Sequence, residues 1–171
     1  MLMPGFSPFW QLAWVTPDLE RSMAQFKALY NVPSFFVMEP VFDAEFNGEK
    51  GSISIRMALA NVDDYQIELI QPIGQGIVRI YTDALPADGS HANVFHHVCT
   101  RVWGTLDDWD AHLASLPPER PICYTGDAPE GIRFCYTDER ASCGLYVEHI
   151  WYSDETWAGL KPLIPHFHSK S

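Results

Sequence analysis

Four polar residues stand at matching places in the two halves of the chain, and their types suit a divalent metal ion. Gln11 opens a strand-like run, and Glu68 lies in a later run 57 residues further on. In the second half His97 opens a strand-like run, and Glu148 follows it by 51 residues. An amide oxygen, an imidazole nitrogen and two carboxylates form a mixed oxygen and nitrogen donor set, which suits Zn, Ni, Co, Mn or Mg.

The surroundings of the two glutamates support a metal site. Glu68 and Glu148 each lie within a run of apolar residues, where a carboxylate is costly unless it is paired or bound to a cation. Two carboxylates would neutralise the ion, and an octahedral site would leave positions for water or substrate, on which the metal acts as a Lewis acid. The alternative is that Gln11 and His97 are polar residues at strand ends, and that both glutamates face solvent on edge strands.

Bringing these residues together requires two similar sets of strands, and the sequence predicts such a repeat. The first half reads as a strand at 11–16, a helix at 19–30 and strands at 35–38, 52–60 and 65–71. The second half reads as a strand at 97–102, a helix from 105 that ends before the prolines at 117–118, and strands at 122–125, 132–137 and 144–151. Because side chains alternate along a strand, we expect Gln11 and His97 to face the same concave side.

We therefore predict an α+β fold in which two tandem βαβββ modules form a curved mixed sheet around a metal-containing cavity. The first module is expected at 1–75, a linker with at most a short strand or turn at 76–94, the second module at 95–155 and a surface tail at 156–171, together forming one domain. The open edges of such sheets favour a homodimer.

Composition narrows the class of protein. The chain has 171 residues, 47% of them apolar, and a formal net charge of −11, which predicts a globular protein that repels nucleic acid and anionic membranes. No apolar run approaches a membrane span, and residues 1–10 contain no Lys or Arg, so we expect no signal peptide. The four cysteines show no CxxC pair and are expected to be reduced and buried in a cytoplasmic protein.

The chain resembles the vicinal oxygen chelate superfamily, which includes glyoxalase I, methylmalonyl-CoA epimerase, bleomycin-resistance proteins and extradiol dioxygenases. The resemblance rests on residues 11–19, 67–74, 95–102 and 144–149 and covers roughly residues 9–152. The motifs at 68–74 and 96–99 are most similar to those of the epimerases. The ligand order Gln, Glu, His, Glu is that of eukaryotic-type glyoxalase I, whereas the epimerases usually begin with His.

This resemblance implies roles for individual residues. It implies that Gln11, Glu68, His97 and Glu148 bind the metal, and that Glu148 is also the proton shuttle. By comparison with the epimerases, Glu49 is the candidate second base, the alternative being a solvated turn residue. From the strand pattern, His96 is expected to pack outward or under the helix. His149, on the opposite strand face from Glu148, is expected to be structural.

The favoured function is that of an isomerase, epimerase or lyase. Its glutamate would shuttle a proton α to a metal-chelated carbonyl of a small-molecule substrate, a thioester or a glutathione adduct. The alternative is a metal-free small-molecule binding protein of the bleomycin-resistance type. A ring-cleaving dioxygenase fits less well. That chemistry resembles an iron site with two His and one carboxylate as ligands, and Gln11 and Glu68 do not match this pattern.

Overall fold

The strands of both halves of the chain join in one closed sheet. The computed structural model describes residues 9–128 and 131–168. The first half forms β1 (Phe9–Val15), α1 (Leu19–Tyr30), β2 (Phe36–Met38), β3 (Val41–Phe46), β4 (Glu49–Val62) and β5 (Tyr65–Ile73). The second forms β6 (Val94–Val102), α3 (Leu106–Ala114), β7 (Ile122–Ala128), β8 (Ile132–Glu139), α4 (Arg140–Cys143) and β9 (Leu145–Tyr152). Both halves therefore contain the βαβββ order.

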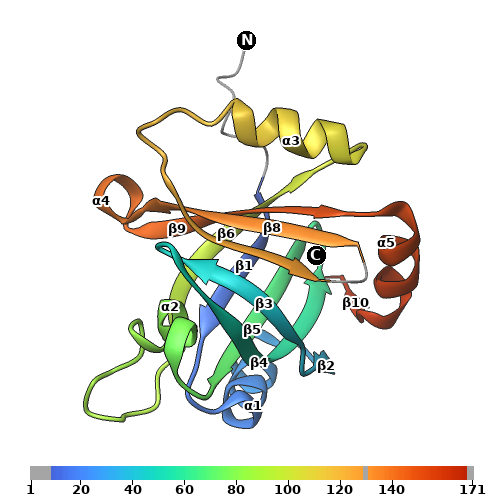
Figure 1. Cartoon of the computed structure of the whole chain (residues 1–171). Coiled ribbons are helices and arrows are strands. Elements are labelled where there is room, and N and C mark those ends of the chain that lie inside the picture. The colour runs from blue at the N-terminus through green and yellow to red at the C-terminus, as the bar shows by residue number, and fades with distance from the viewer. Residues whose placement is uncertain (1–8, 129–130, 169–171) are drawn as a thin grey trace.

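The sheet curves into a barrel with two equivalent halves (Figure 1). Its strands follow one another in the order β4-β3-β7-β8-β9-β6-β1-β5, and β5 pairs again with β4. In each module the first strand runs parallel to the last, as β1 does to β5 and β6 to β9. The modules meet through two antiparallel pairs, β1 with β6 and β3 with β7. The predicted α+β fold, a curved mixed sheet built from two modules, is confirmed.

One amphipathic helix from each module covers the outside of the barrel. The helix α1 begins after Asp18, whose side chain accepts a hydrogen bond from the Arg21 amide, as N-cap residues do. Its buried Leu19 and Phe26 pack on an outer cluster of β4 and β5. The helix α3 begins with a capping box and packs Trp109 against the second module. Within the described residues, no helix is both long and apolar enough to cross a membrane.

The strands of the first module differ in part from those expected. The run at 35–38 does form a strand, β2, but it pairs only with β4 and is not one of the module's barrel strands. The third barrel strand of this module is β3. Along it Phe42, Ala44 and Phe46 are half-buried or buried, whereas Val41 and Asp43 are exposed. The sequence pattern does not predict this strand, because acidic residues, here Asp43 and Glu45, are unfavourable in strands.

The first part of the segment between the modules, residues 76–82, is helical and largely buried. It contains a short 3-10 helix, η1 (Gly76–Val78), followed by α2 (Arg79–Thr82), instead of a strand. Ile77, Val78, Ile80 and Tyr81 of this segment are all at most 3% exposed and belong to the main core. The linker therefore contributes core side chains, one of which reaches the cavity described below.

The C-terminal segment lies on the surface of the barrel and packs a few side chains against it. It forms α5 (Asp154–Leu160), η2 (Lys161–Leu163) and β10 (His166–Phe167), and β10 pairs with the far end of β4. Trp157 and Leu160 pack against the main core. Because β3 and β7 also pair within the chain, open module edges no longer argue for a homodimer, which stays a prediction.

Candidate metal centre

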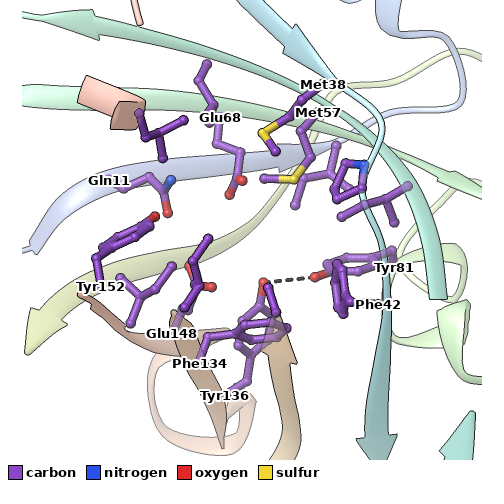
Figure 2. Close-up of a pocket in the computed structure, with 18 residues that line it drawn as sticks. Gln11, Met38, Phe42, Met57, Glu68, Tyr81, Phe134, Tyr136, Glu148 and Tyr152 are labelled. Carbon is purple, nitrogen blue, oxygen red and sulfur yellow. Dashed lines mark hydrogen bonds between the residues drawn. The ribbon is translucent and has the colours of Figure 1, made fainter. Parts of the chain in front are cut away.

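The four predicted ligands lie together inside the barrel, each on a different strand. Gln11 is on β1, Glu68 on β5, His97 on β6 and Glu148 on β9, and their exposed fractions are 3%, 3%, 0% and 6%. The strands β6 and β1 lie at the centre of this array, between β9 and β5. Figure 2 shows the side chains of Gln11, Glu68 and Glu148 converging on one space. The expected convergence is thus present within a single chain.

The distances in this cluster suit a metal ion. The His97 Nε2 atom lies 3.3 Å from Glu68 Oε2 and 3.4 Å from Glu148 Oε2. One ligand atom from each of these three residues can be chosen so that all lie within 4.8 Å of one another. Two carboxylates and an imidazole at this spacing could hold a divalent cation.

Gln11 supplies the fourth donor, and its orientation is fixed by a neighbour on β5. Its Nε2 donates a 2.7 Å hydrogen bond to Gln66 Oε1, and Gln66 Nε2 in turn donates to Asn61 Oδ1 at 3.1 Å. This chain of amides leaves the buried Oε1 of Gln11 without a hydrogen-bond partner. A buried acceptor without a partner is costly, and a cation would satisfy it. The donor set therefore fits a divalent metal.

Hydrogen bonds through His96 fix the tautomer of His97. His96 Nε2 donates to the Ile80 carbonyl oxygen at 3.0 Å, which leaves Nδ1 of the neutral imidazole as an acceptor. His97 Nδ1 lies 2.9 Å from that atom and must be the donor. In a neutral His97 the lone pair is then on Nε2, the atom that faces both glutamates. Such outer hydrogen bonds orient metal-binding histidines.

The inward position of His96 corrects the expectation that it packs outward. Ala13 pairs with His97 while the adjacent Trp14 pairs with Phe95, so His96 is an extra residue in β6 with no partner of its own. Such a β-bulge interrupts alternation and redirects a side chain. Both His96 and His97 are consequently buried, at 4% and 0% exposed. Local sequence gives no reliable sign of a bulge, so alternation alone misassigned His96.

Burial and close charges shift the pKa values of the cluster. Burial alone would lower the pKa of His97, but hydrogen bonds to Glu148 and Glu68 outweigh it and raise the pKa to about 9. Burial raises the pKa of Glu68, against the opposing influence of His97. Burial, together with the charge of His97, lowers the pKa of His96 to about 3, so His96 stays neutral. Without a metal, the proton on His97 serves as the cation between the carboxylates.

The cluster opens onto a cavity with a volume of about 120 Å³. Besides Gln11, Glu68 and Glu148, its polar lining consists of tyrosines. The hydroxyls of Tyr81 and Tyr136 are hydrogen-bonded at 2.9 Å, and Tyr136 Oη lies 3.4 Å from His97 Nε2. The hydroxyl pair is drawn as a dashed line in Figure 2. Burial raises the pKa of both tyrosines, which keeps their hydroxyls protonated.

Comparison with known proteins identifies the family. Residues 10–136 match the family model of the Glyoxalase/Bleomycin resistance protein/Dioxygenase superfamily. The chain belongs to this superfamily. A search of curated proteins finds no match. The resemblance to this superfamily, inferred from the four motifs, is confirmed.

Solved structures show the same fold at low sequence identity. A methylmalonyl-CoA epimerase in complex with methylmalonyl-CoA and NH4+ is 16% identical, with a TM-score of 0.53, over 85% of this chain and 94% of that one. The epimerase from Mycobacterium tuberculosis is 15% identical, with a TM-score of 0.52, over 88% and 91% of the two chains. A hypothetical protein from Bacillus halodurans is 9% identical, with a TM-score of 0.53, over 85% and 94%. The likeness of this superfamily member to these structures concerns the fold.

The structure of this superfamily member does not bring Glu49 to the metal centre. Glu49 begins β4 at its hairpin with β3, its side chain is 50% exposed, and its carboxylate pairs with Arg79. It does not line the cavity. A turn at Asn47 and Gly48, both with positive φ, places Glu49 at the rim of the sheet. The position favours the solvated turn residue over the second base.

Five polar residues that hold the ligands or line the cavity were missed or misassigned by sequence reasoning. They are Gln66, His96, Tyr81, Tyr136 and Tyr152. Gln66 lies two residues before Glu68 on the same strand face and could have been found by alternation. Tyr81 gave no such signal, because it comes from the segment interpreted as a linker.

His149 and Cys143 lie outside the site. His149 faces α3, where its Nδ1 lies 2.9 Å from His112 Nε2. This position agrees with the expectation that His149 lies on the opposite strand face from Glu148 and is structural. All four cysteines are free, and Cys99, Cys123 and Cys135 are buried. Cys143 is exposed, contrary to the expectation that all are buried, because it lies in the surface helix α4.

Proposed function

We propose that the protein is a divalent-metal-dependent enzyme that moves a proton next to a substrate carbonyl, as an isomerase, epimerase or lyase. The observation that carries this proposal is the buried Oε1 of Gln11, which faces the cavity and has no hydrogen-bond partner. Together with Glu68, His97 and Glu148 it would hold one ion of Zn, Ni, Co, Mn or Mg. When bound, the ion would polarise the carbonyl oxygen as a Lewis acid.

The chain's own residues would supply the proton chemistry. Glu148 lies inside the cavity lining and is its candidate base. The substrate C–H bond would break with its electrons passing toward the carbonyl carbon and oxygen, and the proton would move to the Glu148 carboxylate, which returns it to the same or a neighbouring atom. The protonated hydroxyl of Tyr136 could donate a hydrogen bond to the substrate oxygen, and the closed barrel would exclude water.

Two measurements test this proposal. Metal analysis of the purified protein should find about one divalent ion per chain. Deuterium uptake from heavy water should then occur at the α-carbon of a carbonyl compound, tested over thioesters, glutathione hemithioacetals and α-hydroxyketones. We expect Glu148→Gln to slow this exchange by ~10²–10⁴-fold while metal binding survives.

The matched control is Glu49→Gln. This exposed carboxylate is paired with Arg79 outside the cavity, so we expect the variant to exchange deuterium at the wild-type rate. Equal rates for Glu148→Gln and the wild type would contradict the assignment of the base.

A second function is favoured by the apolar walls of the cavity, which also suit a protein that binds a ligand without turnover, as expected of a bleomycin-resistance type. Such a protein would retain no metal after purification and would bind its ligand equally well after treatment with a chelator. Metal content therefore separates the two functions.

A further inference from the structure

The walls of the cavity carry no cation. Apart from the three ligands and three tyrosines, every described lining residue is apolar, and none is Lys or Arg. The sulfur atoms of Met38 and Met57 and the rings of Phe42 and Phe134 surround the space beside the carboxylates (Figure 2). A negatively charged group of a substrate would have no cationic side chain to pair with on these walls, and burying an unpaired charge is costly.

The charge of the metal-loaded centre is also already balanced. The two carboxylates of Glu68 and Glu148 cancel the charge of a divalent ion, while Gln11 and a neutral His97 add none. A neutral substrate preserves this balance, whereas an anion would leave one negative charge uncompensated in a low-dielectric cavity.

Two arginines on strands that line the cavity are paired with acids. The guanidinium of Arg56, on the outer face of β4, contacts Glu20 and Glu39, each at 2.6 Å. Arg133, between two lining residues of β8, lies 3.2 Å from Asp127. With a net charge of −11 for the whole chain, the protein offers little long-range attraction to a polyanionic carrier such as coenzyme A, or to the carboxylates of glutathione.

The volume of the cavity sets the size of its occupant. An engineered apolar cavity of about 150 Å³ is known to bind benzene. The cavity of about 120 Å³ found here therefore suits a molecule, or the part of a molecule that enters it, of at most roughly that size.

We propose that the substrate is a small, uncharged carbonyl compound with an alkyl or compact aromatic body, not an acyl-coenzyme A or a glutathione adduct. This inference rests on the proposed function, since it takes the carbonyl to be the group that meets the metal centre. It narrows the substrate by charge and size.

The direct test compares two ligands of the same shape and different charge. Acetoin and lactate share a hydroxyethyl group, and the acetyl group of acetoin is replaced in lactate by a carboxylate. We expect calorimetric titration of the metal-loaded protein to show acetoin binding at least tenfold more tightly than lactate. Equal affinity, or tighter binding of lactate, would overturn the proposal.

A pair of variants tests whether the uncharged wall is the cause. Leu160 is a half-buried residue of α5 that lines the cavity. Leu160→Lys adds a cation there, and we expect it to reduce the preference for acetoin over lactate severalfold. Leu160→Met adds no charge and should retain the wild-type preference. If the two variants show the same preference, wall charge does not select the ligand.

Deuterium exchange separates failure of this inference from failure of the proposed function. Exchange into a thioester or hemithioacetal, but not into acetoin, would overturn the substrate class and leave the function standing. Acetoin binding more tightly than lactate, with no exchange into any compound, would support the ligand class and overturn the proton-transfer function.

Discussion

The imidazoles of His96 and His97 have different parts in the centre. His97 presents Nε2 to the two carboxylates, while His96 touches no other predicted ligand and connects His97 to the Ile80 carbonyl. His96 also packs between the rings of Tyr81 and Tyr146. It is therefore a positioning residue that acts through His97.

Removing this relay should weaken metal binding. We expect His96→Phe, which keeps an aromatic ring but no hydrogen bond, to raise the metal dissociation constant by ~10–100-fold. His96→Gln retains a donor and an acceptor and should recover part of the affinity. Competition with a chromophoric chelator measures the metal dissociation constants of the wild type and both variants.

The control for this pair is His149→Phe, which removes a buried histidine outside the cavity that contacts His112. We expect its metal affinity to equal that of the wild type even if its thermal stability falls. A similar loss of affinity in the control would show that the effect is general destabilisation.

The metal-free protein should lose stability as the pH rises. The folded-state pKa of His97 is about 9, above its ordinary value of 6.5, and that of Glu68 is raised too. A raised pKa adds stability that is fully present below the unfolded value and is lost as pH rises through the folded value. We therefore expect the Tm of the metal-free protein to fall between pH 6.5 and pH 9.

Calorimetry of the metal-free protein across this pH range would measure how steeply the Tm falls with pH, and His97→Gln should make this fall less steep. Since a metal needs the neutral imidazole, metal binding at pH 7 should release about one proton from His97. Titrations in buffers of different ionisation enthalpy would detect that proton. A Tm that rises over this range would contradict the assigned protonation state.

At the scale of elements, the short helix α2 is the least expected part of the site. It lies between the two modules, and its Ile80 carbonyl and Tyr81 hydroxyl reach the centre from outside the eight barrel strands. Tyr81 is 2% exposed and packs on Tyr124 and Tyr136. Arg79 of the same helix pairs with Glu49 of the first module, so α2 contacts both modules.

Substitution of Tyr81 should separate packing from hydrogen bonding. We expect Tyr81→Phe to lower the free energy of unfolding by about 1 kcal/mol through loss of its bond to Tyr136. Tyr81→Ala should lower it by about 3–5 kcal/mol because it also leaves a cavity. Urea unfolding measures both, and Tyr65→Phe, at a residue that is 52% exposed, should change little. Equal effects of the first two variants would rule out a packing role.

At the scale of the whole molecule, closure of the barrel places the candidate metal centre within one chain. The antiparallel pair of β3 with β7 completes the ring that β1 and β6 begin. All four candidate ligands belong to strands of this ring, two from each module. The centre is therefore formed at the interface between the modules.

Metal stoichiometry tests this arrangement. We expect about one metal ion per chain, unchanged on dilution through the range in which any homodimer dissociates. Light scattering gives the oligomeric state, including the predicted homodimer, and metal analysis of the same fractions gives the ratio. Loss of metal on dissociation would show that a partner chain contributes to the site.

The sequence by itself determined the repeated module and the four ligand candidates. Both follow from local information, because side-chain alternation and the cost of a carboxylate in an apolar strand depend on neighbouring residues. That information placed Gln11 and His97 on one concave side and made Glu68 and Glu148 candidate ligands, and the structure buries all four.

Only the tertiary structure decided what surrounds these ligands. The bulge that turns His96 inward, the exposed place of Glu49 and the insertion of Tyr81 from α2 all depend on strand register and on contacts between residues far apart in the chain. A shift of one residue in register reverses which face a side chain occupies. Pairing between distant strands fixes that register, so alternation within one strand could not predict it.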